Sequence, residues 1–468
     1  MFEGILNTSL YVISTYLFLV VLMQLGLFSL AIGAVRKEHG VDRRQVVEDV
    51  LQDMEVFPCS IIVPCYNEER GIVQTVHSLR QVNYPEKEII VVDDGSTDQT
   101  LAVLKKHFDL YEVERPVHMR LACMRVKAVY RSRNLTELVV VSKLNGGRSD
   151  AINAGINCSS YPYFCCIDAD SLLDKDALVK TMLPIIRDPQ GVIATGGTVR
   201  IANGSVVRDG AVIEQRLPTK PVLIMQVIEY IRAFLLTRIA LSRLNSLLIV
   251  SGAFGVFNKE WVIRAGGFAT DTIAEDMEMT VRLHRLIKEQ QGNHRIIYIA
   301  DPVCWTEAPD SLRVLRRQRR RWHQGLTEVL WRHRVMMFNP RYGKVGLIAM
   351  PFYFLVEWLS VIVEVLGLIA FLVLWITDSG QSALFLLWML ATFAIGSFLS
   401  SLALLLTEWT SHRHRRLSQL FYLYLWALSE SLWYRPFLLA VRLEGKYKAW
   451  LGESTWGEME RKGLTEQG

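Results

Sequence analysis

The stretch SIIVPCYNEE, residues 60–69, predicts a buried β-strand at Ser60–Val63 and a helical pattern from Glu68 to Gln81. The stretch EIIVVDDGSTD, residues 88–98, repeats this order, with a strand at Glu88–Val92 and a helix that begins at Thr97. Further strands are predicted at Leu138–Val141 and Tyr163–Ile167. Such alternation predicts an α/β domain whose mostly parallel sheet carries helices on both faces.

The polar residues that follow these strands are the first functional candidates, because ligands bind at the carboxyl ends of parallel strands. Pro64, Tyr66 and Glu68 follow the first strand, and the acids Asp93 and Asp94 follow the second. Two like charges side by side need a reason. Such carboxylates can accept hydrogen bonds from a nucleoside base or ribose.

The segment KLNGGRSDA, residues 143–151, places two glycines between Lys143 and Arg148. Glycines before a helix allow the main chain to approach phosphate oxygens closely, and the flanking cations supply charge. A structural turn explains the glycines equally well.

Asp168 and Asp170 end the predicted strand Tyr163–Ile167. Alternate carboxylates that leave a strand can both reach one hard cation, and a diphosphate can occupy its open positions. The sequence therefore predicts a Mg²⁺ or Mn²⁺ site at Asp168 and Asp170.

The acids Glu275 and Asp276 open a helical pattern at Met277–Ile287. Acids at a helix N-terminus are favoured by the helix dipole alone. The functional reading is a general base aimed at an acceptor hydroxyl, which typically accelerates a reaction ~10²- to 10⁴-fold.

The stretch RRQRRRWH, residues 316–323, has two interpretations. One is a basic surface helix beside anionic lipid. In the other, Gln318, Arg321 and Trp322 lie on neighbouring helix faces, Trp322 supports a sugar ring and Arg321 neutralises a leaving diphosphate.

Long apolar runs enclose this central region. Leu10–Ala34 is uncharged and long enough for a membrane span, and the basic residues after it, including Arg43 and Arg44, place the following domain in the cytoplasm. Apolar runs in 345–441 predict further spans, with a basic linker at His412–Arg416. Their acids, including Glu430, either line a conduit or pair between helices. The basic tail leaves the number of spans open.

Overall composition restricts the function classes. The formal net charge of +5 is too mild to suggest nucleic acid as a partner, and 51% of the residues are hydrophobic, a high share for a soluble enzyme. The seven cysteines form no CxxC pair, which indicates reduced thiols in the cytoplasm.

Taken in order, these motifs resemble the processive, membrane-integrated enzymes of glycosyltransferase family 2, the cellulose, hyaluronan and poly-N-acetylglucosamine synthases. The bacterial poly-β-1,6-N-acetylglucosamine synthase type is the nearest match. The resemblance implies a GT-A-like nucleotide-sugar-binding domain flanked by transmembrane and amphipathic interface helices. It also implies an inverting enzyme of the bacterial inner membrane that polymerises UDP-N-acetylglucosamine or UDP-glucose into a β-linked polysaccharide and feeds it across the membrane.

The resemblance assigns roles by matching positions. Tyr66, Glu68 and Asp94 hold the uridine, Asp168 contacts the nucleotide, and Asp170 binds the cation. Asp276, beside Glu275, is the catalytic base, and the acceptor sugar and pyrophosphate contact Gln318, Arg321 and Trp322. Two positions depart from the family: Ala274 replaces a threonine, and Arg148 replaces a lysine, which leaves open whether Lys143 or Arg148 binds phosphate.

The expected layout is an anchor at 1–35, a cytoplasmic glycosyltransferase domain at 36–310, an interface helix at 311–344, a transmembrane region at 345–441 and a basic tail at 442–468. Expected partners are the UDP-sugar, the growing polysaccharide, membrane lipids and, given the few helices, a small membrane subunit. The main alternative is a non-processive enzyme that moves one sugar to a lipid or short acceptor.

Overall fold

The structure, a computed structural model, describes residues 2–38, 56–114, 119–208, 211–376, 382–410 and 417–452. The basic residues Arg43 and Arg44, the linker His412–Arg416 and the tail beyond residue 452 lie outside these ranges.

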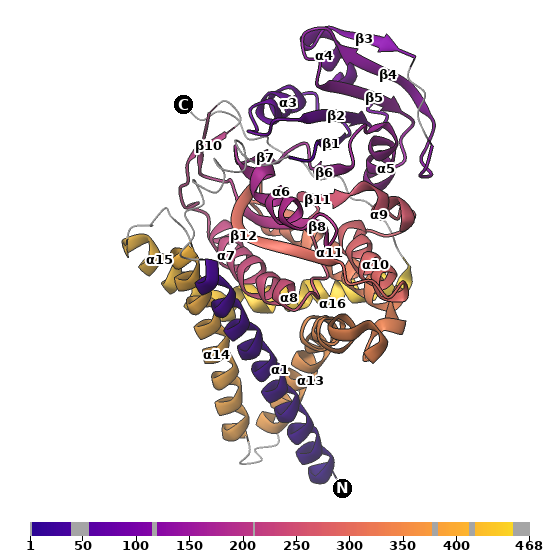
Figure 1. Ribbon diagram of the computed structural model, residues 1–468. Coiled ribbons are helices and arrows are strands. Elements are labelled where there is room, and N and C mark those ends of the chain that lie inside the picture. The colour runs from indigo at the N-terminus through magenta and orange to yellow at the C-terminus, as the bar shows by residue number, and fades with distance from the viewer. Residues whose placement is uncertain are drawn as a thin grey trace.

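A ten-stranded mixed sheet forms the centre of the molecule (Figure 1). Its strands are β1 (Cys59–Cys65), β2 (Lys87–Asp93), β3 (Leu110–Val113), β4 (Val126–Ser132), β5 (Leu138–Lys143), β6 (Tyr163–Ile167), β7 (Leu172–Leu173), β8 (Val192–Ile201), β11 (Phe254–Asn258) and β12 (Arg295–Thr306). Their order is β3-β4-β5-β2-β1-β6-β11-β8-β12-β7. The run β5-β2-β1-β6 is parallel, as predicted, so the ends of these four strands meet at one edge.

Strand β11 connects this parallel run to the rest of the sheet. It runs antiparallel to β6, with Phe254 opposite Ile167, and antiparallel to β8. The residues just before β11 therefore lie beside the carboxyl end of β6. This register brings Gly252 next to Asp168, although 84 positions separate them in the chain.

The four predicted strands are confirmed, and β6 has the predicted bounds. The helix predicted over Glu68–Gln81 begins later, as α3 (Ile72–Arg80). Asn67 adopts a left-handed conformation (φ 55°), and the main-chain N–H of Glu68 donates to the hydroxyl of Thr100 at 2.9 Å. The residues after β1 are thus held in a turn, which keeps them at the sheet edge.

The helix predicted from Thr97 also begins later, as α4 (Thr100–His107). The carboxylate of Asp98 accepts the main-chain N–H of Thr100 at 2.9 Å, so it satisfies a donor of the first helical turn. The helical pattern at Met277–Ile287 extends to α10 (Glu275–Glu289).

Helices cover the sheet and connect it to the apolar part of the chain. They include α5 (Arg148–Cys158), which packs on β1 and β2, and α6 (Ala177–Arg187), which packs on β8 and β12. The other helices used below are α7 (Pro221–Ile231), the π-helix η1 (Arg232–Arg238), α8 (Ile239–Arg243), α11 (Leu312–Arg332), η6 (Glu430–Tyr434) and α16 (Arg435–Leu451). In Figure 1, α7, α8 and α16 lie between the sheet and the long apolar helices.

The long apolar helices are α1 (Phe2–Glu38), α13 (Ser360–Ile376), α14 (Ser382–Thr410) and α15 (Leu417–Ser429). Among the described residues, the segments Tyr11–Arg36 and Val345–Ala370 are long and apolar enough to cross a membrane. Helix α1 packs against α8, η1, α13 and α14. The apolar segments therefore form a connected layer on one side of the sheet.

Two expectations about the C-terminal region can be compared with the structure. The Glu430 carboxylate accepts hydrogen bonds from Arg232 at 2.8 Å and from Ser400 at 2.9 Å, so this acid pairs between helices. The expected boundary between residues 441 and 442 falls inside α16, because the helix continues to Leu451.

Candidate active site

The end of β2 and the end of β5 are joined by a buried ion pair. The ammonium of Lys143 contacts Asp94, and it lies 2.6 Å from the Asp150 carboxylate. Asp94 also accepts the main-chain N–H groups of Gly146 and Gly147, at 3.1 and 2.7 Å. Lys143 and Asp94 are buried and paired with each other, so they shape the glycine loop and do not expose their charges at the sheet edge.

Arg148, at the start of α5, connects three elements. Its guanidinium donates from Nε to Asp168 at 2.8 Å and from Nη2 to the carbonyl of Gly252 at 2.6 Å, and it pairs with Glu275. The planar guanidinium suits this task because it presents several donors in fixed directions. One arginine thus ties the end of β6 to the start of β11 and of α10.

Asp276 joins the same group through the main chain. Its Oδ2 accepts the N–H of Gly252 at 2.9 Å, and its Oδ1 accepts the N–H of Met277 at 2.8 Å. Asp276 is half-buried, whereas Glu275 is buried. Burial raises the pKa of Glu275, against the opposing effect of Arg148. Of these two acids, Asp276 has the more open carboxylate.

Asp168 and Asp170 lie in a turn after β6 and are both half-buried. The carbonyl of Asp168 accepts the N–H of Ser171 at 3.0 Å, and the Ala169 carbonyl accepts the hydroxyl of Thr75 at 2.5 Å. Within the described ranges, no group of three or more His, Cys, Asp or Glu side chains is arranged to hold a metal ion. Two hard carboxylates fit part of a Mg²⁺ or Mn²⁺ coordination sphere, with the remaining positions left for other oxygens.

The residues after β1 lie at the same edge of the sheet. Pro64 is buried within the strand, Tyr66 is 47% exposed and Glu68 is half-buried. The side chain of Asn67 accepts the N–H of Thr97 at 2.8 Å, which joins this turn to the residues after β2. An exposed ring and a half-buried carboxylate therefore lie beside the parallel strand ends.

Helix α11 carries Gln318, Arg321 and Trp322. Trp322 is 44% exposed, and the Gln318 side-chain oxygen accepts from Arg319. One turn further along, Gly325 packs directly against Ala274, the residue before the acidic pair. This close contact aligns α11 with the N-terminus of α10, and it leaves no room for a larger side chain at position 325.

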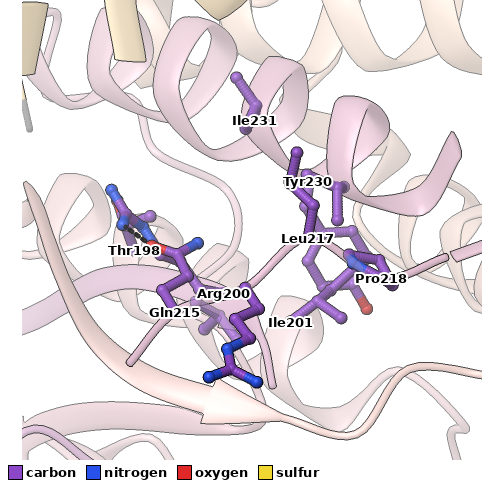
Figure 2. A pocket seen from close by; sticks show the side chains of 11 residues that line it. Thr198, Arg200, Ile201, Gln215, Leu217, Pro218, Tyr230 and Ile231 are labelled. Atoms are coloured by element: carbon purple, nitrogen blue, oxygen red, sulfur yellow. Dashed lines mark hydrogen bonds between the residues drawn. The ribbon is translucent and has the colours of Figure 1, made fainter. Parts of the chain in front are cut away.

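A small cavity lies between β8 and α7. It has a volume of about 30 Å³ and is lined by residues of β8, residues 215–218 and α7, including Thr198, Arg200, Gln215 and Tyr230 (Figure 2). A cavity of this size holds about one water molecule. It is too small for a sugar ring, and neither Arg148 nor Asp276 lines it.

Two residues of this arrangement were not among the predicted site residues. Gly252 contributes only main-chain atoms, which no side-chain pattern reports. Arg319 stands in an arginine run, but its spacing of four from Leu315 and from His323 marks a common helix face, and all three are buried.

Comparison with known proteins places the chain in a family. The model of glycosyl transferase family 2 matches residues 60–264, and that of glycosyl transferase family group 2 matches residues 163–429. A poly-beta-1,6-N-acetyl-D-glucosamine synthase of Staphylococcus epidermidis (strain ATCC 35984) is 29% identical over 299 residues, 63% of this chain and 60% of the relative. The synthase of Staphylococcus aureus (strain COL) is 28% identical over 279 residues, 59% of this chain and 57% of the relative. The matches thus span less than two-thirds of these relatives.

Among solved structures, the mannosyltransferase PcManGT from Pyrobaculum calidifontis, in complex with GDP-Man and Mn²⁺, is 18% identical with a TM-score of 0.47. That match covers 93% of this chain and all of the mannosyltransferase, but a TM-score of 0.47 supports no conclusion beyond the sequence match. The curated relatives are of the poly-N-acetylglucosamine synthase type that the motifs predicted. Because the family group 2 model covers more than half of the chain, the protein belongs to glycosyl transferase family group 2, which confirms the predicted fold class and the prediction of a glycosyltransferase.

Proposed function

We propose that this chain is an inverting, membrane-bound glycosyltransferase that polymerises UDP-N-acetylglucosamine into a β-linked polysaccharide. The observation that carries the proposal is the link between Asp276 and Asp168 through Gly252 and Arg148. It sets a half-buried base beside the residues proposed to hold the donor. The names of the curated relatives favour N-acetylglucosamine over glucose.

The donor site uses the carboxyl ends of the parallel strands. Tyr66 and Glu68 contact the uridine, and Pro64 supports this turn. Asp94 and Lys143 act on the nucleotide indirectly, because their buried ion pair fixes the loop of Gly146 and Gly147.

The diphosphate lies near Arg148 and the acids after β6. Of the two candidate cations for phosphate, Arg148 is the one beside Asp168, whereas Lys143 is buried in its own ion pair. Asp168 and Asp170 hold the Mg²⁺ or Mn²⁺. When bound, the cation supplies positive charge that stabilises the departing nucleoside diphosphate.

The transfer step is a single displacement. Asp276 accepts the proton of an acceptor hydroxyl, whose oxygen forms a bond to the anomeric carbon while the bond to the diphosphate oxygen breaks. UDP leaves, and attack from the opposite face converts an α-linked donor into a β-linkage. The N–H of Gly252 holds the Asp276 carboxylate in place, and Glu275 keeps Arg148 in its position.

The acceptor end of the polymer rests on Trp322, with Gln318 and Arg321 beside it. The two candidate membrane spans support a membrane-bound protein. The proposal further includes the bacterial inner membrane as its location, a cytoplasmic catalytic domain, export of the polymer and a small membrane subunit.

The test is UDP release by the purified protein with a panel of UDP-sugars, Mg²⁺ or Mn²⁺, and sizing of the product on a gel. A long polymer formed from UDP-N-acetylglucosamine is the expected result. A product extended by one sugar would replace polymerisation with single transfer, and no UDP release with any donor would overturn the proposal.

A further inference from the structure

Arg319 is buried, with 5% of its surface exposed, although it belongs to an arginine-rich stretch of α11. Its guanidinium forms a fork on Glu229 of α7, with Nη2 at 2.8 Å from Oε2 and Nε at 3.1 Å from Oε1. The hydroxyl of Tyr434, from η6, donates to the same carboxylate at 2.6 Å. A buried charge is tolerated when it is paired and hydrogen-bonded, and both conditions hold here.

The same guanidinium contacts two residues proposed to bind the acceptor. Its central carbon lies 4.0 Å from the centroid of the Trp322 ring, a cation–π distance. Its Nη1 donates to the side-chain oxygen of Gln318. One face of the indole is therefore covered by a fixed cation while Trp322 stays 44% exposed.

The support for Arg319 comes from outside the nucleotide-binding part of the sheet. Helix α7 packs against α14 and α15, and η6 packs against the same two helices. Burial disfavours the charged form of Glu229, yet Arg319 and the Tyr434 hydroxyl hold the pKa of Glu229 below its ordinary value. The carboxylate is thus charged at neutral pH and can fix Arg319.

We propose that Arg319, held by Glu229 and Tyr434, is a positioning residue that fixes the Trp322 indole and the Gln318 amide for the acceptor sugar. The inference rests on the proposed function, in which Trp322 supports the acceptor. It adds that helices packed on the apolar layer fix the acceptor platform, which consists of Trp322 and Gln318. This support is independent of the donor site at Arg148 and Asp168.

The test compares acceptor and donor kinetics in full-length protein. Tyr434→Phe removes one hydroxyl and keeps the ring, and Arg319→Lys keeps a cation but loses the fork. The Michaelis constant is measured for a β-1,6-linked N-acetylglucosamine tetrasaccharide and, separately, for UDP-N-acetylglucosamine. The control is Arg316→Lys. Arg316 lies on α11 like Arg319, but its ion pair with Glu444 of α16 is more exposed.

Both variants are expected to raise the Michaelis constant for the tetrasaccharide by about threefold to tenfold, which lies within the range of a cation–π contact. The constant for UDP-N-acetylglucosamine stays at the control's value, whereas the unfolding temperature falls in both variants, because each weakens a buried, hydrogen-bonded ion pair. Equal changes in both constants, or a change only in unfolding temperature, would show that Arg319 is merely structural and overturn the inference.

Trp322→Ala distinguishes the positioning role of Arg319 from the proposed role of Trp322 in acceptor binding. A raised constant for the tetrasaccharide in Trp322→Ala, with no change in Tyr434→Phe and Arg319→Lys, removes the positioning role and leaves the proposed function intact. An unchanged constant in Trp322→Ala removes the acceptor platform itself, and with it the inference.

Discussion

The main-chain nitrogen of Gly252 lies 2.9 Å from Oδ2 of Asp276, and the carbonyl of the same glycine accepts from Arg148. A single peptide segment therefore orients the proposed base and the cation beside the proposed donor site. Its position follows from the antiparallel register of β11 on β6.

The first prediction concerns Asp276→Asn. The asparagine oxygen can still accept from Gly252, and only the bond from the Met277 N–H is lost, but the amide cannot take a proton from the acceptor. Transfer should fall ~10²- to 10⁴-fold, the usual contribution of general base catalysis. UDP binding, measured by calorimetry, should match the parent protein. Normal turnover by this variant would refute the assignment of the base.

The second prediction concerns Arg148→Lys. An ammonium cannot serve Asp168, Glu275 and the Gly252 carbonyl together, because it lacks the planar fork. The ratio kcat/KM for the UDP-sugar should fall roughly tenfold to a hundredfold, as expected for the loss of charged hydrogen bonds. The control is Arg120→Lys in an exposed pair with Glu260, which should leave kcat/KM unchanged. Equal kinetics for both variants would exclude Arg148 from donor binding.

The gathering of the donor-side motifs could be predicted from the sequence because these motifs follow β1, β2, β5 and β6, and parallel strands end at one edge. The register of β11 could not, since it depends on pairing between segments far apart in the chain. Gly252 was missed for that reason: its role lies in main-chain atoms that become important only when β11 pairs with β6.

The arginine run in α11 could not be interpreted from the sequence for a similar reason. Residue type does not show which of the neighbouring arginines is buried, because Arg319 is distinguished by its partner Glu229, which also binds Tyr434, and both residues lie on other helices. At Lys143 the sequence left open whether this residue or Arg148 binds phosphate, because both flank the two glycines. Tertiary contacts that the sequence does not report bury Lys143 between Asp94 and Asp150.

The third prediction follows from that burial. Lys143→Met preserves side-chain length but leaves Asp94 and Asp150 without their cation, which should cost about 3–5 kcal/mol of stability. The control, Lys220→Met, breaks a more exposed pair with Asp310 and should cost about 0–1 kcal/mol. Thermal unfolding in detergent compares the two. A similar loss in both variants would contradict a structural role for the buried pair.

The fourth prediction concerns the metal. Chelation with EDTA should stop UDP release, and Mg²⁺ or Mn²⁺ should restore it. UDP with Mn²⁺ should raise the unfolding temperature of the parent protein, since a ligand at a hundred times its Kd stabilises by about 2.7 kcal/mol. Asp170→Asn should lose most of this shift, whereas Asp174→Asn, which alters the pair with Lys180, should retain it. A full shift in Asp170→Asn would remove Asp170 from the metal site.

The fifth prediction concerns the pH dependence of stability and depends on His284 of α10. Burial lowers the pKa of His284 to about 4, although its ring lies 2.9 Å from the Leu247 carbonyl, just before β11. The unfolded chain takes up a proton near the ordinary value of 6.5, but the folded protein does not until about pH 4. Stability is therefore fully present above pH 6.5 and falls as the pH drops toward 4, by up to roughly 3 kcal/mol.

His284→Gln removes the titrating group, so it should flatten this part of the pH profile. Its unfolding temperature should change less than that of the parent protein between pH 7 and pH 5. His107→Gln, at an exposed position of α4, should keep the parent slope. A parent slope in His284→Gln would assign the acid sensitivity to another group.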